Sequence, residues 1–352
     1  MLLFLFMLRS VSYIVRTNGD TKNRFCDFYS ERKDSIDAFI VGSSPVYPYY
    51  SAPKMFGEYG FTCFPLSSSM QRPLAVKYVL KEAYKTQKPG LVIIEMRMFT
   101  GKDSDMTANT AYTRGVTDNM KYSLNRIDTI NAIVPVIKDR SVVDPMLTYY
   151  IDIFKYHSNW GMMLMPSEWR HWDYCANDPL KGYVFQDKLG PCTRQDCRGI
   201  TESEPIPEEQ EKALRDLIVF LKARGQDTLF IVSPYLETAD NKKMYNYMAS
   251  IIDGSGFRMI DMNDDVDSIG LDYSTEIADY GVHVNALGAV KCTDYLAKYI
   301  KSNYDMPDHR NDPKYSKWED SYQTWKTEQA KEAKIIESRI KNHDYNDLKD
   351  KD

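Results

Sequence analysis

Asp37-Ala-Phe-Ile-Val-Gly-Ser-Ser-Pro-Val46 is the stretch that decides the fold, because an apolar run stops in it on a glycine and two serines. A continuous apolar run of strand length is typical of a strand buried on both faces of a parallel sheet. Open α/β folds keep their functional sites at the carboxyl edge of such a sheet. The stretch therefore predicts a strand over about 36–42 that brings the hydroxyl of Ser44 to this edge.

A second segment, Asp279-Tyr-Gly-Val-His-Val-Asn-Ala-Leu-Gly288, supplies a carboxylate and an imidazole just before the last predicted helix of the α/β part. A serine hydroxyl is a weak nucleophile until a base takes its proton, and an acid must hold that base in the right tautomer. In a parallel sheet both segments fall on the same edge. The order of the residues therefore suggests a serine hydrolase with Ser44 as nucleophile, Asp279 as acid and His283 as base.

Strand and helix patterns alternate through most of the chain. Apolar runs of strand length lie at about 36–42, 61–66, 91–96, 228–234 and 257–262, and helical spacing recurs at about 73–87, 207–224, 245–252 and 286–303. A strand, a helix and a further strand in succession imply a right-handed crossover and a parallel sheet. We expect a three-layer α/β/α sandwich with a five-stranded parallel sheet, which is flavodoxin-like.

The remaining segments divide the chain. Residues 1–30 are first apolar and then polar, 31–310 form the α/β domain, and 311–352 are a charge-rich tail, helical at first and frayed past 340. About 100–205 is too long for a crossover, so we interpret it as a helical insertion that caps the sheet edge. We expect 17–35 to be a connector and the proline-rich stretch after Ser44 to be irregular.

Composition excludes some classes of function. The chain has 352 residues and a net charge of −5, with acids and bases interspersed, which argues against a nucleic-acid binder. No CxxC pair occurs among the six cysteines, so no metal site is predicted. Cys192 and Cys197 either close a small disulfide, if the protein is exported, or stay unpaired, with Cys63 and Cys292 in the core.

The first eight residues are apolar and Arg9 ends the run, which is shorter than a membrane span. Two interpretations are open: the tail of a signal anchor whose beginning is missing, or a short piece packed on the domain. The first implies a protein of the cell envelope, anchored in the membrane and facing outside. The second leaves a cytoplasmic location open.

Several motifs together resemble the SGNH (GDSL-like) hydrolases. Gly42-Ser-Ser44 is similar to the Gly-Asp-Ser block of that family, and His283 matches its base. The runs 35–44, 84–95, 156–160 and 283–288 resemble a clostridial group of its membrane-anchored bacterial branch, which includes the D-alanyl-lipoteichoic-acid transfer protein. The matches cover most of residues 30–305. The family's acid sits three residues before the histidine, whereas Asp279 sits four before His283.

The resemblance also implies an oxyanion hole made by the serine N–H, a small residue after the second strand and an asparagine after the third. Ser67-Ser-Ser69 occupies the second place, but Glu95-Met-Arg97 stands at the third. Arg97 or Gln71 would therefore have to contact the acyl oxygen. Pro45 removes a backbone donor beside the nucleophile. The candidates for contacting substrate or oxyanion are Ser43, Ser69, Gln71, Arg97, Tyr156, His157 and Asn285.

The function that this resemblance implies is a serine-dependent esterase or O-acyltransferase that works through an acyl-enzyme on an acylated cell-surface glycan, without metal or organic cofactor. Its partners would be that glycan or a small ester, with membrane association through the N-terminus. The alternative is a non-catalytic protein of the same fold that binds glycan or serves as a scaffold in an envelope assembly. The spacing of Asp279 and the missing asparagine favour this alternative. For Tyr156 and His157, packing in an aromatic core is the competing interpretation.

Overall fold

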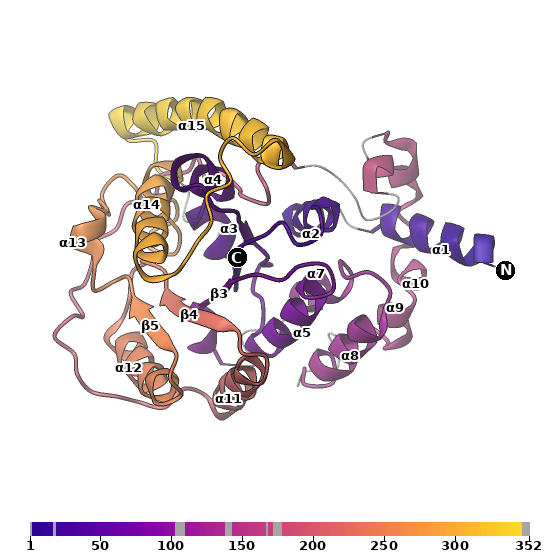
Figure 1. Cartoon of the computed structure of the whole chain (residues 1–352), viewed down its shortest axis with the longest axis horizontal. Helices are drawn as coiled ribbons and strands as arrows, with labels where there is room; N and C mark the ends of the chain where they lie inside the picture. The colour runs from indigo at the N-terminus through magenta and orange to yellow at the C-terminus, as the bar shows by residue number, and fades with distance from the viewer. Residues whose placement is uncertain are drawn as a thin grey trace.

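One sheet of five parallel strands lies at the centre of the molecule (Figure 1). The computed structural model describes residues 2–16, 19–102, 110–137, 143–166, 168–171 and 178–346. The strands are β1 (Ala38–Val41), β2 (Cys63–Pro65), β3 (Leu91–Glu95), β4 (Asp227–Val232) and β5 (Arg258–Asp261), in the order β2-β1-β3-β4-β5. This is the flavodoxin-like order, whose direction reverses between β1 and β3, where such sheets bind their ligands.

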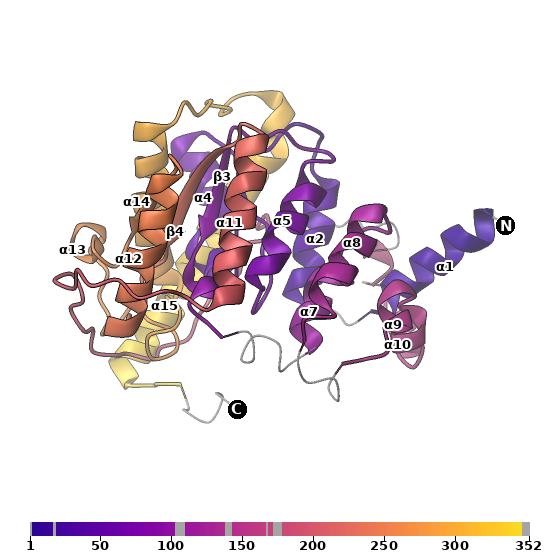
Figure 2. The same ribbon diagram turned by 90° about the horizontal axis from the view of Figure 1, so that it is seen from below.

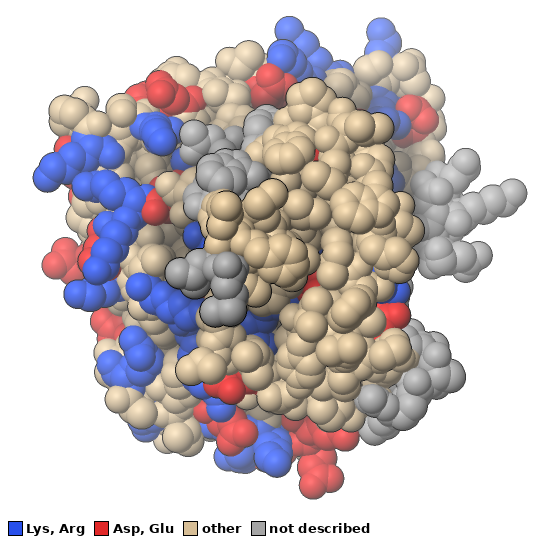
Figure 3. All heavy atoms as spheres, turned by 90° about the vertical axis from the view of Figure 1, so that its right-hand side faces the viewer, with Lys and Arg blue, Asp and Glu red and all other residues tan. Residues whose placement is uncertain are grey.

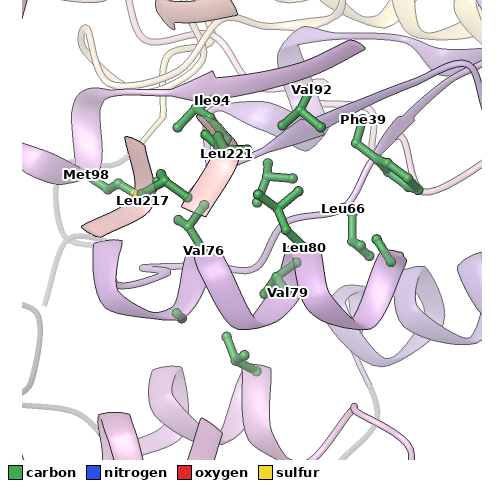
Figure 4. Close-up of a cluster of buried hydrophobic side chains, with 14 of the residues drawn as sticks. Phe39, Leu66, Val76, Val79, Leu80, Val92, Ile94, Met98, Leu217 and Leu221 are labelled. Carbon is green, nitrogen blue, oxygen red and sulfur yellow. The ribbon is translucent and has the colours of Figure 1, made fainter. Parts of the chain in front are cut away.

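Helices cover both faces of the sheet, so the predicted three-layer sandwich is confirmed. Alternate residues of β1 point to opposite faces: Phe39 and Val41 join one apolar cluster, and Ala38 and Ile40 join the other. The first cluster contains the apolar faces of α5 (Pro73–Ala83), α11 (Glu208–Ala223) and α12 (Ala239–Gly254). In Figure 4, Val76, Val79 and Leu80 of α5 and Leu217 and Leu221 of α11 meet Phe39, Val92 and Ile94 of the sheet.

The opposite face is covered by α3 (Val46–Tyr49), α4 (Ala52–Tyr59) and α14 (Ala286–Asn303). α15 (Ser316–Asn342) lies outside them and contributes Trp325 to their cluster (Figures 1 and 2). The short elements are η1 (Arg97–Phe99), α13 (Val266–Ile269) and η5 (Pro313–Tyr315). Burial on both faces explains why the strands are continuous apolar runs in the sequence.

The irregular stretch expected after Ser44 is instead two short helices. In α4, Ser51 caps the N-terminus by accepting the N–H of Lys54, and Pro53 lies in the first turn, where a missing N–H costs nothing. Gly60, with φ of 89°, ends this helix in the left-handed conformation. The prolines in this segment therefore mark helix starts rather than breaks.

The connector predicted for 17–35 is also wrong, because residues 20–30 form α2 (Asp20–Ser30). Lys22, Arg24 and Asp27 of this helix are buried, although their charges made the segment look solvent-exposed. Arg24 donates to the carbonyls of Gly182 at 3.0 Å and Ser67 at 2.9 Å. Its partners are backbone oxygens far along the chain, which no local sequence pattern indicates.

The long insertion holds α7 (Thr110–Thr117), α8 (Leu124–Ile133), α9 (Leu147–Tyr150), α10 (Ile153–Tyr156), η3 (Trp160–Leu164) and η4 (Glu168–His171). Its described helices lie beside α5 and α2, toward α1 (Leu2–Ile14), rather than over the sheet edge (Figure 2). Ile130 and Ile133 of α8 join the apolar cluster of α5, which explains this position. The segment 178–206, by contrast, runs along the loop that carries His283, where the N–H of Gly190 donates to Ile277 O at 2.9 Å.

Five cysteines lie among the described residues, and no disulfide joins any two of them, Cys192 and Cys197 included. The disulfide between those two is therefore not formed, and Cys63 and Cys292 lie in the core, as the other interpretation had it. Cys175 lies outside the described residues. Within the described part of the chain, no helix is both long enough and apolar enough to span a membrane.

Candidate active site

Ser44 lies in the turn between β1 and α3, at the carboxyl edge of the sheet. The preceding Gly42 allows this turn because a Cβ there would lie 2.7 Å from Cβ of Glu95 and 2.9 Å from Cγ2 of Val46. The N–H of Val46 donates to Ser43 O at 3.1 Å, which starts α3 directly after the serine. A residue with a side chain at 42 would push the strand end and the serine away from β3.

Asp279 and His283 lie on a tight loop closed by an antiparallel bridge between Ile277 and Val284. Within the loop, Ala278 N–H donates to His283 O at 2.8 Å. Tyr280, with φ of 60°, and Gly281, with φ of 109°, are both in the left-handed region. These two residues turn the chain back, so that residues 279 and 283 face each other.

The structure brings the three predicted residues into one hydrogen-bonded chain. His283 Nε2 lies 2.9 Å from Ser44 Oγ, and His283 Nδ1 lies 2.7 Å from Asp279 Oδ2. The other carboxylate oxygen of Asp279 accepts the backbone N–H of His283 at 2.6 Å. Both oxygens of Asp279 thus hold the histidine, which shows how a spacing of four residues still pairs acid and imidazole.

Burial by itself would raise the pKa of Asp279, but the hydrogen bonds and charge of His283 outweigh it, so the pKa is lowered. The carboxylate is therefore ionised at neutral pH. An ionised carboxylate fixes the proton on Nδ1 and leaves Nε2 free to accept a proton from Ser44.

An open cavity of about 260 Å³ adjoins the serine. Pro45, Met70, Met98 and Val282 give it apolar walls, and its polar side chains include Ser43, Thr100, Arg97 and Asn241. Ser44 from β1 and Arg97 from β3 thus face one cavity at the strand pair where the sheet order reverses. Sites of this fold lie at that pair of strands.

The guanidinium of Arg97 has no carboxylate within 4.0 Å among the described residues, although the side chain is half-buried. Its guanidinium stacks 4.1 Å from the centroid of the Tyr235 ring, and Nη1 donates to Tyr49 Oη at 3.3 Å. Burial acts to lower its pKa, but Tyr49 and Glu95 outweigh that and raise it. A permanently charged donor therefore lies on the cavity wall with hydrogen-bonding capacity left over.

Tyr49 and Glu95 support this arrangement, and sequence reasoning gave neither of them a role at the site. Tyr49 is fully buried, donates to Pro234 O at 2.8 Å, and its ring centroid lies 6.4 Å from that of His283, with the ring planes at 65°. Glu95 is fully buried and accepts the N–H groups of Arg97 at 3.3 Å and Ser233 at 3.4 Å. Burial raises the pKa of Glu95 to about 7. The sequence contains one indication that Glu95 has a role: it is an acidic residue at the end of an otherwise apolar strand.

The loop after β2 is held in place, but only Met70 from it lines the cavity. Ser69 Oγ lies 2.9 Å from Tyr47 Oη, and Gln71 Oε1 accepts Ser68 Oγ–H at 3.3 Å. Gln71 is fully buried and its Nε2 has no partner among the described residues. The contact with the acyl oxygen predicted for Ser69 and Gln71 stays a prediction.

Three other candidates do not line this cavity. Tyr156 donates its hydroxyl to Asp118 at 2.7 Å within the insertion, and His157 is exposed. Asn285 is buried, accepts the N–H of Leu287 at the start of α14 and donates to Thr275 O. Its amide is a helix cap, which explains why an asparagine follows the His283 loop.

No group of three or more histidine, cysteine or acidic side chains suited to hold a metal ion occurs in the described part of the chain. Neither a family model nor a curated protein matches the sequence. The geometry of the site is therefore the main indication of function.

Proposed function

We propose that this protein is a serine-dependent esterase or O-acyltransferase with the chemistry of the SGNH hydrolases that it resembles. The observation that carries the proposal is the continuous chain from Ser44 Oγ through both ring nitrogens of His283 to Asp279 Oδ2, with distances of 2.9 and 2.7 Å. This chain opens onto a cavity that accommodates a small ester. An acylated cell-surface glycan is the substrate that the resemblance favours.

In the proposed first half-reaction, Ser44 Oγ attacks the acyl carbonyl carbon while His283 Nε2 takes the hydroxyl proton. The imidazolium is stabilised by the ionised Asp279. The tetrahedral intermediate then collapses, the bond to the leaving alkoxide breaks, and His283 returns the proton to that oxygen. The acyl group stays on Ser44 as an ester.

In the second half-reaction, water or a sugar hydroxyl loses its proton to His283 and attacks the acyl-enzyme. Water gives a free acid and makes the protein an esterase, whereas a sugar hydroxyl gives a new ester and makes it an acyltransferase. The oxyanion of both intermediates needs fixed donors. Arg97 supplies a charged one beside the cavity, and one such donor typically contributes about 3–4 kcal/mol to catalysis.

A fluorophosphonate probe tests the proposal, because its phosphorus reacts with a serine that a neighbouring base activates, which gives a serine phosphonate ester and releases fluoride. We expect covalent labelling of the wild-type protein, peptide mapping of the adduct to Ser44, and no adduct in Ser44→Ala. Ser274→Ala, which changes an exposed serine that is not part of this hydrogen-bonded chain, is the matched control and keeps the label on Ser44. An adduct on another serine, or none in the wild type, would contradict the proposal.

The competing function is a non-catalytic glycan-binding or scaffold protein of an envelope assembly. The feature that favours it is the absence of an asparagine after β3, where Glu95-Met-Arg97 stands. A protein of this kind would bind acylated glycan but leave Ser44 unlabelled. Glycan binding that is unchanged in Ser44→Ala, together with no label in the wild type, would establish it.

Membrane association at the cell envelope belongs to the same proposal. Residues 3–7 of α1 are large, apolar and exposed, and five successive helical positions cover the whole circumference. A protein groove would cover one side of such a helix, whereas lipid covers all sides. Figure 3 shows that the side of the molecule on which α1 lies has a wide, mostly uncharged face. The exposed large apolar residues of the insertion include Tyr122, Leu124, Ile127, Leu147, Ile151, Phe154, Trp160, Leu164, Met165 and Trp169.

Flotation with phospholipid vesicles tests this part separately. We expect the wild-type protein to float with the vesicles and the double variant Phe4→Ser/Leu5→Ser to remain in the dense fraction. Val219→Ser, at an exposed apolar residue of α11, is the matched control and still floats. Equal flotation of all three proteins would contradict a membrane contact through α1.

A further inference from the structure

The chain after α15 turns back toward the loop that carries Asp279 and His283. α15 ends at Asn342, and His343, with φ of 53°, is in the left-handed conformation that reverses the direction of the chain. The N–H of Asp344 donates to Arg339 O at 2.9 Å and closes the turn. The following residues are thereby directed onto the surface of the α/β domain, where Asn346 N–H donates to Leu189 O at 2.9 Å.

Asn346 contacts the catalytic loop on both sides of the acid. Its side-chain Nδ2 donates to Ala278 O at 2.5 Å, and its backbone carbonyl accepts the hydroxyl of Tyr280. Ala278 and Tyr280 are the two neighbours of Asp279 in the sequence. One residue from the far end of the described chain therefore holds the backbone immediately before and after the carboxylate.

The loop needs such external support. Tyr280 has a left-handed backbone, which costs a residue with a side chain roughly 1–2 kcal/mol and persists only where the surroundings enforce it. The side chain of Asp279 is 32% exposed, so packing alone does not fix it. The segment 189–190 holds the loop as well, because Tyr280 N–H donates to Gly190 O at 2.8 Å. Asn346 also donates its N–H to Leu189 O, so one residue contacts both the segment 189–190 and the catalytic loop.

We propose that Asn346 is a positioning residue for the catalytic loop: it keeps Asp279 at hydrogen-bonding distance from His283, and the segment 343–346 is thus part of the working site. This inference rests on the proposed function for its catalytic consequence. Its structural consequence, protection of the loop from local opening, does not depend on any activity.

Two variants test the proposal. Asn346→Ala removes the bond to Ala278 O but keeps the backbone carbonyl that Tyr280 contacts, and Tyr280→Phe removes only the latter bond. The matched control is Asn342→Ala, which changes an exposed asparagine four residues earlier whose amide donates to Ser338 Oγ at 3.4 Å. Losing one hydrogen bond of about 1 kcal/mol corresponds to roughly a fivefold change in an equilibrium.

Hydrogen exchange over residues 277–284 is the first measurement. We expect exchange in Asn346→Ala to be about fivefold faster than in Asn342→Ala, with a melting temperature that changes by no more than about 3 °C. Exchange that is equal in the two variants would overturn the proposal. Faster exchange over the whole chain would overturn it too, because it would indicate general destabilisation.

Turnover of a small ester is the second measurement. A misplaced acid slows the chemical step, so we expect kcat of Asn346→Ala to fall about tenfold while KM changes less than twofold. An unchanged kcat in a variant whose loop is deprotected would show that Asn346 does not position the acid. If the wild-type protein neither turns over ester nor takes up the fluorophosphonate, the proposed function fails and the catalytic role with it, whereas the exchange experiment still decides whether the segment holds the loop.

Discussion

Two pairs of histidine and aspartate lie at opposite ends of β1. At the carboxyl end, His283 pairs with Asp279 at 2.7 Å; before the first residue of the strand, Asp37 pairs with His309 at 3.1 Å. The two imidazoles are equally accessible, with side chains 21% and 19% exposed. Pairing and burial alone therefore do not distinguish a catalytic histidine from a structural one.

The two pairs differ in the groups that contact each histidine and aspartate. His309 stacks on the ring of Tyr315 with centroids 4.0 Å apart, and Asp37 also accepts the N–H and hydroxyl of Thr62. Among the described residues, His309 has no hydrogen bond to a hydroxyl. His283 instead has Ser44 at its second nitrogen, beside an open cavity. The hydroxyl of Ser44 and the open cavity beside it therefore distinguish the His283 pair from the His309 pair.

The largest expected effect comes from removing each histidine in turn. Among the described residues, His283 is the only base in contact with Ser44, so we expect His283→Ala to lower the rate of fluorophosphonate labelling at least about 10⁴-fold. His309→Ala removes an imidazole from the other pair and is expected to label at the wild-type rate. Comparable losses in both variants would mean that the two pairs do not differ as described.

The two acids give the next largest effect. Asp279→Asn keeps the shape of the side chain but presents an amide to the imidazole, which favours the wrong tautomer, and we expect labelling to slow by about 10³- to 10⁴-fold. Asp37→Asn should cost about 1 kcal/mol of unfolding free energy and leave labelling unchanged. Denaturant unfolding and labelling time courses check the two expectations. A labelling defect in Asp37→Asn would contradict the assignment of that pair to structure.

Arg97 sharpens the comparison, because it lines the cavity beside Ser44 at the carboxyl end of the sheet. For Arg97→Met we expect kcat toward a small ester to fall about 10²-fold with KM nearly unchanged, since the charge stabilises the oxyanion rather than the ground state. Arg97→Lys keeps the charge but loses the planar fork and should recover only part of the rate. Arg224→Met is the control, because Arg224 also stacks on a tyrosine, at 4.0 Å, but lies away from this cavity. A rise in KM alone would assign Arg97 to substrate binding.

The last prediction concerns stability rather than activity. Burial raises the pKa of Glu95 to about 7 from an ordinary 4.5, so the folded protein holds a proton on this group that the unfolded chain releases. The unfolding free energy therefore falls between about pH 4.5 and 7, by up to about 3 kcal/mol, and is constant above. Glu95→Gln should flatten this slope, whereas Glu319→Gln, on the exposed side of α15, should keep it. Urea unfolding at several pH values measures both slopes.

The sequence predicts the strands and the position of the site correctly, because both depend on local apolar runs and on the parallel pairing of the strands. Five apolar runs predicted the five strands, and the edge where Ser44 and His283 meet followed from parallel pairing. Charge misled the interpretation of α2, because Arg24 and Asp27 are buried against partners contributed by distant loops. The support from Asn346 was missed for the same reason: the tail was expected to fray, and nothing near residue 346 indicates Ala278. Such contacts depend on tertiary structure, which spacing does not encode.

The span of the site has a consequence for how the protein is made. Ser44 and His283 are 239 residues apart in the chain, and Asn346 follows 68 residues after Ala278. A chain emerging from the ribosome therefore carries Ser44 long before its base exists, and the loop with the acid precedes the residue that braces it. A nascent chain that ends between residues 262 and 282 is expected to contain all five strands but an inert serine, so reactivity appears only after His283 has been made.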